Sequence, residues 1–187
     1  MSPRKRDEPV RLDRIYTRGG DGGETSLGDG SRVSKLDPLV SAFGAVDELN
    51  SLLGVAQVVA RDERLRRIQN ELFDVGADLC VPYVEGDGRL RITQPAIDRL
   101  ERDCDNANAD LAPLKSFVLP GGTEAAARLH VVRAACRRAE REVIAAAEAR
   151  TVNPLAVVYL NRLSDLLFIL ARAANPPGEE PLWTPGG

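Results

Sequence analysis

Apolar residues recur at three- and four-residue steps along most of the chain after residue 38, which is the period of amphipathic helices. The first run begins at Pro38, and the same period predicts a second helix over residues 62–78. A turn containing Gly then interrupts the pattern. Pro95, in the first turn behind Thr93, is typical of a helix start and predicts a third helix that ends near Leu111.

Two further helices follow a connector over residues 113–122. The fourth is long and is predicted over residues 123–150. Asn153 followed by Pro154 is a cap-and-start pair, which predicts a fifth helix that ends near residue 174. Five helices with short connections predict an all-α fold, a five-helix bundle.

Both ends of the chain differ from this helical part. The first 35 or so residues are rich in Gly, Thr, Ser and Asp and predict an ordered or inducible loop. The last residues are rich in Pro and Gly and predict a disordered or loosely docked tail. We therefore expect a single domain over residues 1–187, with a glycine-rich N-terminal loop and with residues 1–12 and 175–187 flexible.

Composition and charge narrow the classes of partner. The net charge of −3 argues against a general nucleic-acid binder, whose surface is normally basic. Three widely separated cysteines match neither a metal motif nor a disulfide framework, so we expect reduced thiols in a cytoplasmic protein. The N-terminus lacks the apolar region of a secretory signal, and no stretch approaches about 20 uninterrupted apolar residues, so no membrane partner is expected.

The fourth predicted helix carries an unusual concentration of arginine. Four arginines fall within nine residues, more than the two nearby glutamates can balance, although local pairs such as Arg137–Glu140 would suit a solvated face. Packing like charges this closely calls for an anion, and the planar arginine fork is the usual partner of phosphate oxygens. An apolar stripe lies beside the arginine face: Leu129, Val132, Cys136, Ala139 and Val143.

A glycine-rich segment near the N-terminus is a second candidate for phosphate binding. Thr17, Arg18, Gly19 and Gly20 begin it, and glycine lets backbone N–H groups approach a ligand closely. The segment is neither a Walker loop nor a dinucleotide fingerprint. Lys35 follows and could add a point charge.

Polar residues also occur between apolar neighbours in the first and last helices. Asp47, Glu48, Asn161 and Asp165 occupy such positions, and a buried carboxylate needs a partner. The surplus arginines supply one, and an Asp47–Arg133 pair is our specific hypothesis. The single histidine, His130, has neither a second histidine nor a carboxylate three residues earlier, so we expect a core or interface residue and no metal site built from side chains alone.

Four blocks of sequence occur together in one known family: IYTRGGDGGETSL at 15–27, FGAVDELNSLLG at 43–54, FVLPGGTEAAARLHVVRAACRRAER at 117–141 and YLNRLSDLLFILAR at 159–172. In these blocks the sequence resembles the PduO-type ATP:cob(I)alamin adenosyltransferases, and the resemblance covers most of the chain. The resemblance implies a homotrimer of five-helix bundles with active sites between neighbouring subunits. ATP and cob(I)alamin are then the substrates, and Mg²⁺ accompanies the phosphates.

The resemblance also implies roles for particular residues. Arg137 and Arg138 match the phosphate-binding arginines, Asp47 and Arg133 match an intersubunit salt bridge, and Phe117 matches the aromatic residue that helps to displace the lower axial ligand from cobalt. The other positions implied to contact ATP are Thr17, Arg18, Gly19, Gly20, Thr25, Lys35, Glu140, Arg141 and Asn161.

The first block departs from the family pattern. The family usually has Thr-Gly-Asp-Lys-Gly where this chain has Gly at positions 19 and 22, which loosens the loop or changes its affinity for ATP. The implied reaction is attack of cob(I)alamin on the 5′ carbon of ATP with triphosphate leaving, which needs no activated side-chain nucleophile. A cobalamin reductase and an adenosylcobalamin-dependent enzyme are implied as partners.

Two other functions stay open at this level. A helical nucleotide phosphohydrolase would need clustered carboxylates for metals, and Glu71 with Asp74 and Asp98 with Glu101 have loosely suitable spacing. Interleaved arginines indicate solvated faces for both pairs. A carrier that binds adenosylcobalamin without turnover would use the same residues as the transferase.

Overall fold

The computed structural model describes residues 16 and 18–186. All five predicted helices are present within a residue or a few of their expected ends, and a small hairpin that was not predicted precedes them. The hairpin pairs two antiparallel strands, Thr25 facing Val33. The elements in chain order are β1 (Glu24–Ser26), β2 (Arg32–Ser34), α1 (Pro38–Ala60), α2 (Glu63–Leu79), α3 (Gln94–Asn108), α4 (Glu124–Ala149) and α5 (Pro154–Ala173).

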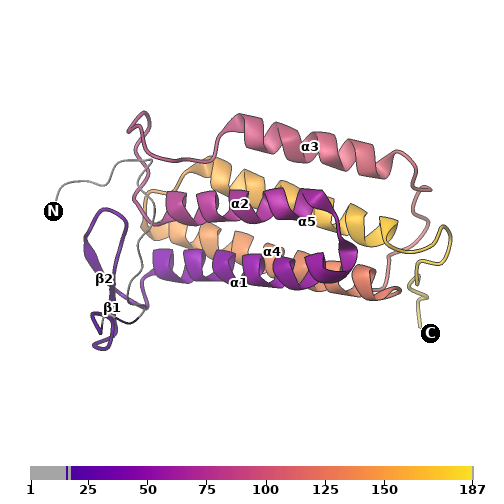
Figure 1. The fold of residues 1–187 in the computed structure, drawn as a ribbon, viewed down its shortest axis with the longest axis horizontal. Helices are drawn as coiled ribbons and strands as arrows, with labels where there is room; N and C mark the ends of the chain where they lie inside the picture. Colours follow the sequence, from indigo (N-terminus) through magenta and orange to yellow (C-terminus); the bar gives the residue numbers. More distant parts are fainter. Residues whose placement is uncertain (1–15, 17, 187) are drawn as a thin grey trace.

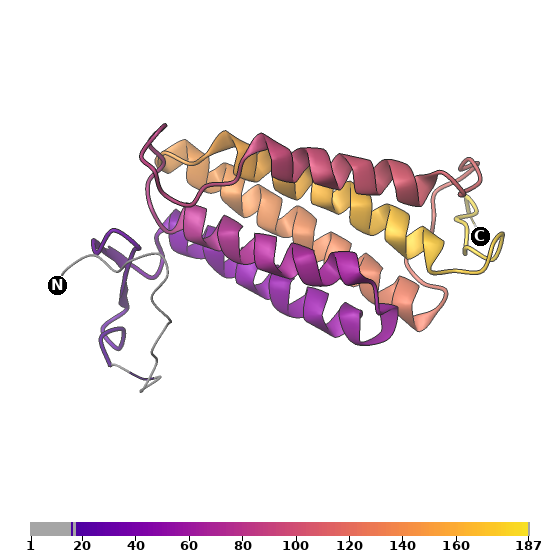
Figure 2. The ribbon, with the colours of Figure 1, turned by 45° about the horizontal axis from the view of Figure 1, so that its top comes forward.

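The helices lie roughly side by side, with α4 in the middle (Figures 1 and 2). Helix α4 packs against α1 and α5, while α2 packs on α1 and α3 packs on α5. The hairpin lies at the end of the bundle where α1 begins, and the C-terminal segment lies at the opposite end (Figure 1). The hairpin and the C-terminal segment are therefore separated by the length of the bundle.

Side-chain caps fix where the long helices begin. Asp37 accepts a hydrogen bond from the backbone N–H of Leu39 at 3.0 Å and caps α1. Asn153 accepts one from the N–H of Leu155 at 3.1 Å, which confirms the predicted start of α5. Each cap is followed by a proline, whose fixed φ suits the first helical turn.

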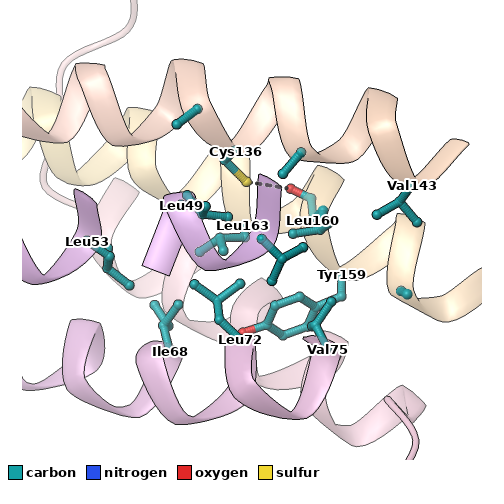
Figure 3. Packing of buried hydrophobic residues seen from close by; sticks show 14 of the residues in the cluster. Leu49, Leu53, Ile68, Leu72, Val75, Cys136, Val143, Tyr159, Leu160 and Leu163 are labelled. Carbon is teal, nitrogen blue, oxygen red and sulfur yellow. Dashed lines mark hydrogen bonds between the residues drawn. The ribbon is translucent and has the colours of Figure 1, made fainter. Parts of the chain in front are cut away.

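The core is formed by leucine, isoleucine, valine and alanine from all five helices (Figure 3). The predicted apolar stripe of α4 is buried throughout. Within it, the thiol of Cys136 donates a hydrogen bond to the backbone oxygen of Leu160 on α5 at 3.2 Å. Tyr159 is completely buried in the same core.

A buried polar cluster ties α2, α3 and α5 together. The hydroxyl of Tyr159 donates to Glu71 Oε2 at 2.8 Å, Arg99 Nη2 donates to Glu71 Oε1 at 2.9 Å, and Arg67 Nε lies 3.4 Å from the same oxygen. Glu71 is buried, so its expected place on a solvated face was wrong. Its arginine partners are Arg67, one turn earlier on α2, and Arg99, which reaches it from α3.

The tail, which was expected to be flexible, lies against the connector before α4. The N–H of Leu119 donates to the oxygen of Pro181 at 2.7 Å, and the N–H of Trp183 donates to the oxygen of Phe117 at 2.8 Å. An ion pair of 2.8 Å between Arg172 and Glu180 adds a second attachment. These contacts hold the tail at the end of the bundle.

Helices α1 and α5 are long and apolar enough to cross a membrane by length and composition alone, with mean hydropathies of 1.3 and 1.5. Their most apolar windows are 44% and 50% buried inside the bundle. Core helices of soluble proteins share these properties, and both helices pack against α4.

Candidate functional site

The residues of the glycine-rich segment lie in a turn that leads into the hairpin. Arg18 adopts a left-handed conformation with φ of 61°, and the N–H of Gly23 donates to the oxygen of Gly20 at 3.2 Å. The guanidinium of Arg32 on β2 donates to the oxygen of Gly19 at 2.8 Å. Arg32, which the sequence analysis did not include among the candidate residues, thus links the turn to the hairpin.

Lys35 lies beside this turn. A Cβ added to Gly20 would lie 3.1 Å from Lys35 Nζ, so the absence of a side chain at position 20 lets the ammonium group approach the backbone. Thr25 follows on β1 and is half-buried. The structure therefore brings together Arg18, Gly19, Gly20 and Lys35, whereas Thr17 lies outside the described residues.

The arginines of α4 form a second group, in the middle of the bundle. Arg138 forms an ion pair with Glu48 of α1. Arg137 and Arg141 are exposed, and no ion pair joins either to another residue in the described part of the chain. Arg133 is half-buried, and its Nε atom has no hydrogen-bond partner among residues 16 and 18–186.

Arg133 shows that this group lacks counter-charge. Burial, and then the positive charge of Arg137 one turn away, lower the pKa of Arg133 from its ordinary value. Burial, and then the positive charge of Arg133, lower the pKa of His130, whose two ring nitrogens are buried without a hydrogen-bond partner in the described chain. The face therefore needs a negative or hydrogen-bonding group from elsewhere.

Helix α5 contributes to the same face through Asn161. Its amide donates to Glu140 Oε1 at 2.9 Å, so two residues implied to contact ATP are in direct contact. The bond holds the Glu140 carboxylate on the α5 side of the helix. Arg137, one turn away on α4, is left without that carboxylate as a partner.

Asp47 and Arg133 do not form an ion pair within the described chain, where the α1–α4 pair is Glu48–Arg138 instead. The carboxylates of α1 and α5 were expected to be buried, and this was wrong for a single subunit. Asp47, Glu48, Asn161 and Asp165 are all exposed, because their buried neighbours occupy the inward side of each helix.

Phe117 lies at the end of the bundle opposite the hairpin, in the connector before α4 (Figure 1). Its side chain is 78% exposed, and its ring meets that of Trp183 edge to face with centroids 5.9 Å apart. The sequence interpretation missed Trp183. A lone tryptophan among prolines could have indicated a docking residue, but the pattern did not show where it docks.

Comparison with known proteins places this arrangement in a family. A family model for cobalamin adenosyltransferase matches residues 15–174 of the chain. The chain belongs to the cobalamin adenosyltransferase family. Among curated members, the corrinoid adenosyltransferase of Mycobacterium tuberculosis is 53% identical over 95% of this chain and 96% of its own length. The cobalamin adenosyltransferase of Cupriavidus metallidurans is 43% identical, over 92% of this chain and 95% of its own length.

A solved member of the adenosyltransferase family has the same fold. It is a phenylalanine-to-alanine variant of a PduO-type ATP:corrinoid adenosyltransferase from Lactobacillus reuteri, complexed with cobalamin and ATP. It superposes with a TM-score of 0.83 at 36% identity, covering 91% of this chain and 99% of its own. The five-helix fold is thus that of the PduO-type adenosyltransferases.

Proposed function

We propose that the chain transfers the 5′-deoxyadenosyl group of ATP to cob(I)alamin, with triphosphate leaving, at a site shared between subunits of a homotrimer. Membership of the family supports the reaction. The observation that carries the site is the shortage of counter-charge on α4, where Arg137 is exposed without an ion pair in the described chain and where burial, and then the charge of Arg137, lower the pKa of Arg133. A triphosphate supplies that charge.

The reaction needs little from side chains beyond positioning and charge. The cobalt lone pair attacks C5′ of ATP, the cobalt–carbon bond forms, and the C5′–O5′ bond breaks with its electron pair passing to the triphosphate. No proton is transferred in this step. Catalysis therefore depends on aligning the two substrates and stabilising the charge that grows on the leaving group.

Arg137 and Arg138 bind the triphosphate in this proposal, with Arg141 beside them. Arg138 can exchange its present partner for phosphate, because its ion pair with Glu48 is partly exposed and such pairs contribute only about 0–1 kcal/mol. The Asn161–Glu140 bond orients the polar edge of the same face. The backbone N–H groups of the turn at residues 18–23 and Lys35 bind the nucleotide from the other side.

Mg²⁺ enters with the nucleotide. No group of three or more His, Cys, Asp or Glu side chains among residues 16 and 18–186 is placed to hold a metal ion. Phosphate oxygens and water are the ligands that Mg²⁺ prefers at nucleotide sites, so the arginines would neutralise the remaining charge.

Phe117 provides an exposed apolar surface for the lower face of the corrin ring, with Trp183 supporting its ring from the side. An apolar group in that position disfavours a bound axial base, and cobalt without an axial base is easier to reduce. We propose a cobalamin reductase, which would supply the reduced substrate, and an adenosylcobalamin-dependent enzyme, which would use the product, as partners. The three free thiols favour a cytoplasmic location.

A homotrimer would bring together candidate groups that lie far apart within one subunit. One subunit places the turn and Phe117 at opposite ends, and it leaves exposed Asp47 and half-buried Arg133 without ion pairs to each other. An Asp47–Arg133 pair across the subunit boundary would satisfy Arg133 and bring the groups of neighbouring copies together.

A charge-swap experiment tests this arrangement. Asp47→Arg and Arg133→Asp should each abolish most activity, and mixing the two variant proteins after separate purification and subunit exchange should restore it. Restoration requires that the two positions meet across a boundary. If activity returns only when Asp47→Arg and Arg133→Asp are combined on one chain, and never on mixing, the shared site is wrong. If analytical ultracentrifugation shows a monomer, the homotrimer is wrong.

A further inference from the structure

The hairpin that carries the proposed nucleotide turn contacts the bundle at a second place besides its continuation into α1. Leu27 is buried in the core cluster, and the N–H of the next residue, Gly28, donates to the backbone oxygen of Cys80 at 2.8 Å. Cys80 is the C-cap residue that follows α2. Val33 of β2 packs against the same core, and residues 35–37 continue the chain into α1.

Gly28 fits this place because it has no side chain. A Cβ built on it would lie 2.8 Å from Val81 Cγ2 and 3.4 Å from the oxygen of Cys80. No left-handed φ is involved, since the positive-φ glycines of the hairpin are Gly23 and Gly30. The requirement for glycine at position 28 is therefore steric.

The backbone that Gly28 contacts is held in place by hydrogen bonds from Arg91. Arg91 Nη1 donates to the oxygen of Val81 at 3.0 Å and to Asp78 Oδ1 at 2.7 Å, while its Nη2 donates to the oxygen of Pro82 at 2.9 Å. Asp78 is buried and is held in turn by the amide of Asn153 at 2.7 Å. A displacement at this contact must therefore be taken up by the hairpin.

The hairpin transmits such a displacement to the turn. The loop between its strands is closed by the N–H of Leu27 donating to the oxygen of Ser31 at 2.8 Å, and by the N–H of Gly30 donating to the oxygen of Leu27 at 3.0 Å. Arg32, which follows Ser31, donates a hydrogen bond to the oxygen of Gly19 at 2.8 Å. Gly28 and the turn thus belong to one hydrogen-bonded unit.

We propose that Gly28, seated on Cys80 and Val81 at the end of α2, is a positioning residue that sets the place of the nucleotide turn relative to the bundle. The proposal rests on the assignment of ATP to that turn. Gly28 itself contacts no substrate. Its role is to fix the angle at which the hairpin leaves the bundle, so that the turn meets ATP bound at α4.

Gly28→Ala tests the proposal in the full-length protein. We expect the KM for ATP to rise by roughly tenfold, because a methyl group inserted into filled space displaces its surroundings. The KM for cob(I)alamin and the kcat at saturating ATP should stay within about twofold, since α4 and Phe117 are untouched. Val81→Ala removes the clashing Cγ atoms, so the double variant should recover most of the affinity for ATP.

A control variant and a second measurement complete the test. Gly76→Ala is the matched glycine substitution, since a Cβ there meets nothing within 4 Å, and its kinetics should equal those of the wild type. Hydrogen–deuterium exchange of the peptide covering residues 24–34, measured without ATP, should be faster in Gly28→Ala and slow again in the double variant. Wild-type kinetics for Gly28→Ala, or a loss that Val81→Ala does not relieve, would overturn the proposal.

The exchange measurement also separates this proposal from the proposed function. If the wild-type protein does not use ATP but the variants show the expected exchange pattern, the proposed function is rejected, while the contact of Gly28 with Cys80 and Val81 still positions the hairpin. Normal ATP use by the wild type with no exchange difference in Gly28→Ala would reject the positioning role alone.

Discussion

Replacing Arg137 with alanine separates substrate binding from folding, because the structure leaves this side chain exposed and without an ion pair in the described chain. Surface substitutions of this kind usually change stability by no more than about 0.5 kcal/mol. A charge-assisted hydrogen bond to phosphate is worth about 1.5–3 kcal/mol. Its loss should therefore reduce kcat/KM for ATP by roughly 10- to 200-fold at unchanged oligomeric state.

The assay is the anaerobic disappearance of cob(I)alamin absorbance at varied ATP concentration. Arg102→Ala is the matched control, since Arg102 is also an exposed helical arginine but lies on α3, away from the site, and it should retain wild-type rates. Arg137→Lys should fall between the two, because lysine keeps the charge but loses the bidentate fork. An Arg137→Ala protein with wild-type kinetic constants would refute the assignment of this residue to triphosphate.

Three further predictions concern other parts of the molecule. Phe117→Ala should slow the reaction that starts from cob(II)alamin plus reductant more than the one that starts from cob(I)alamin, and equal losses would contradict its role at cobalt. Tyr159→Phe removes a buried hydrogen bond to Glu71 and should lower the Tm by about 4–10 °C while activity at 25 °C is unchanged; a loss of activity without a lower Tm would instead favour a catalytic Glu71. His130 is buried, and burial lowers its pKa, so below its unfolded pKa of 6.5 the unfolded chain binds more protons and stability falls as the pH falls; His130→Gln should flatten this fall below pH 6.5 in chemical denaturation, and an unchanged slope would show that other groups cause it.

The helices could be predicted because their signals are local. Asn153–Pro154 specifies a cap within two residues, and the buried stripe of α4 repeats over about four turns. The hairpin could not be predicted in this way. Each of its strands has only three residues, too few to show a period of two, and they join through Gly and Ser.

The residue types of the candidate site could be predicted, but not which carboxylate pairs with which arginine. The surplus of arginine on α4 indicated an anion site, and Arg137 forms no ion pair with any of residues 16 and 18–186. The sequence did not show which carboxylate meets which arginine, because that depends on how α1 is rotated against α4, and Glu48 proved to face Arg138. Glu71 was misplaced for the same reason, since its partners Arg99 and Tyr159 come from other helices.

The central claim, adenosyl transfer rather than binding alone, is tested most directly by identifying the products of a single anaerobic reaction. The purified protein is mixed with ATP, Mg²⁺ and chemically reduced cobalamin, and both the corrinoid and the phosphate products are quantified. We predict one equivalent of adenosylcobalamin and one of intact triphosphate per ATP consumed, over many turnovers. Tight binding of adenosylcobalamin without turnover, or release of pyrophosphate or phosphate as the primary product, would contradict the account.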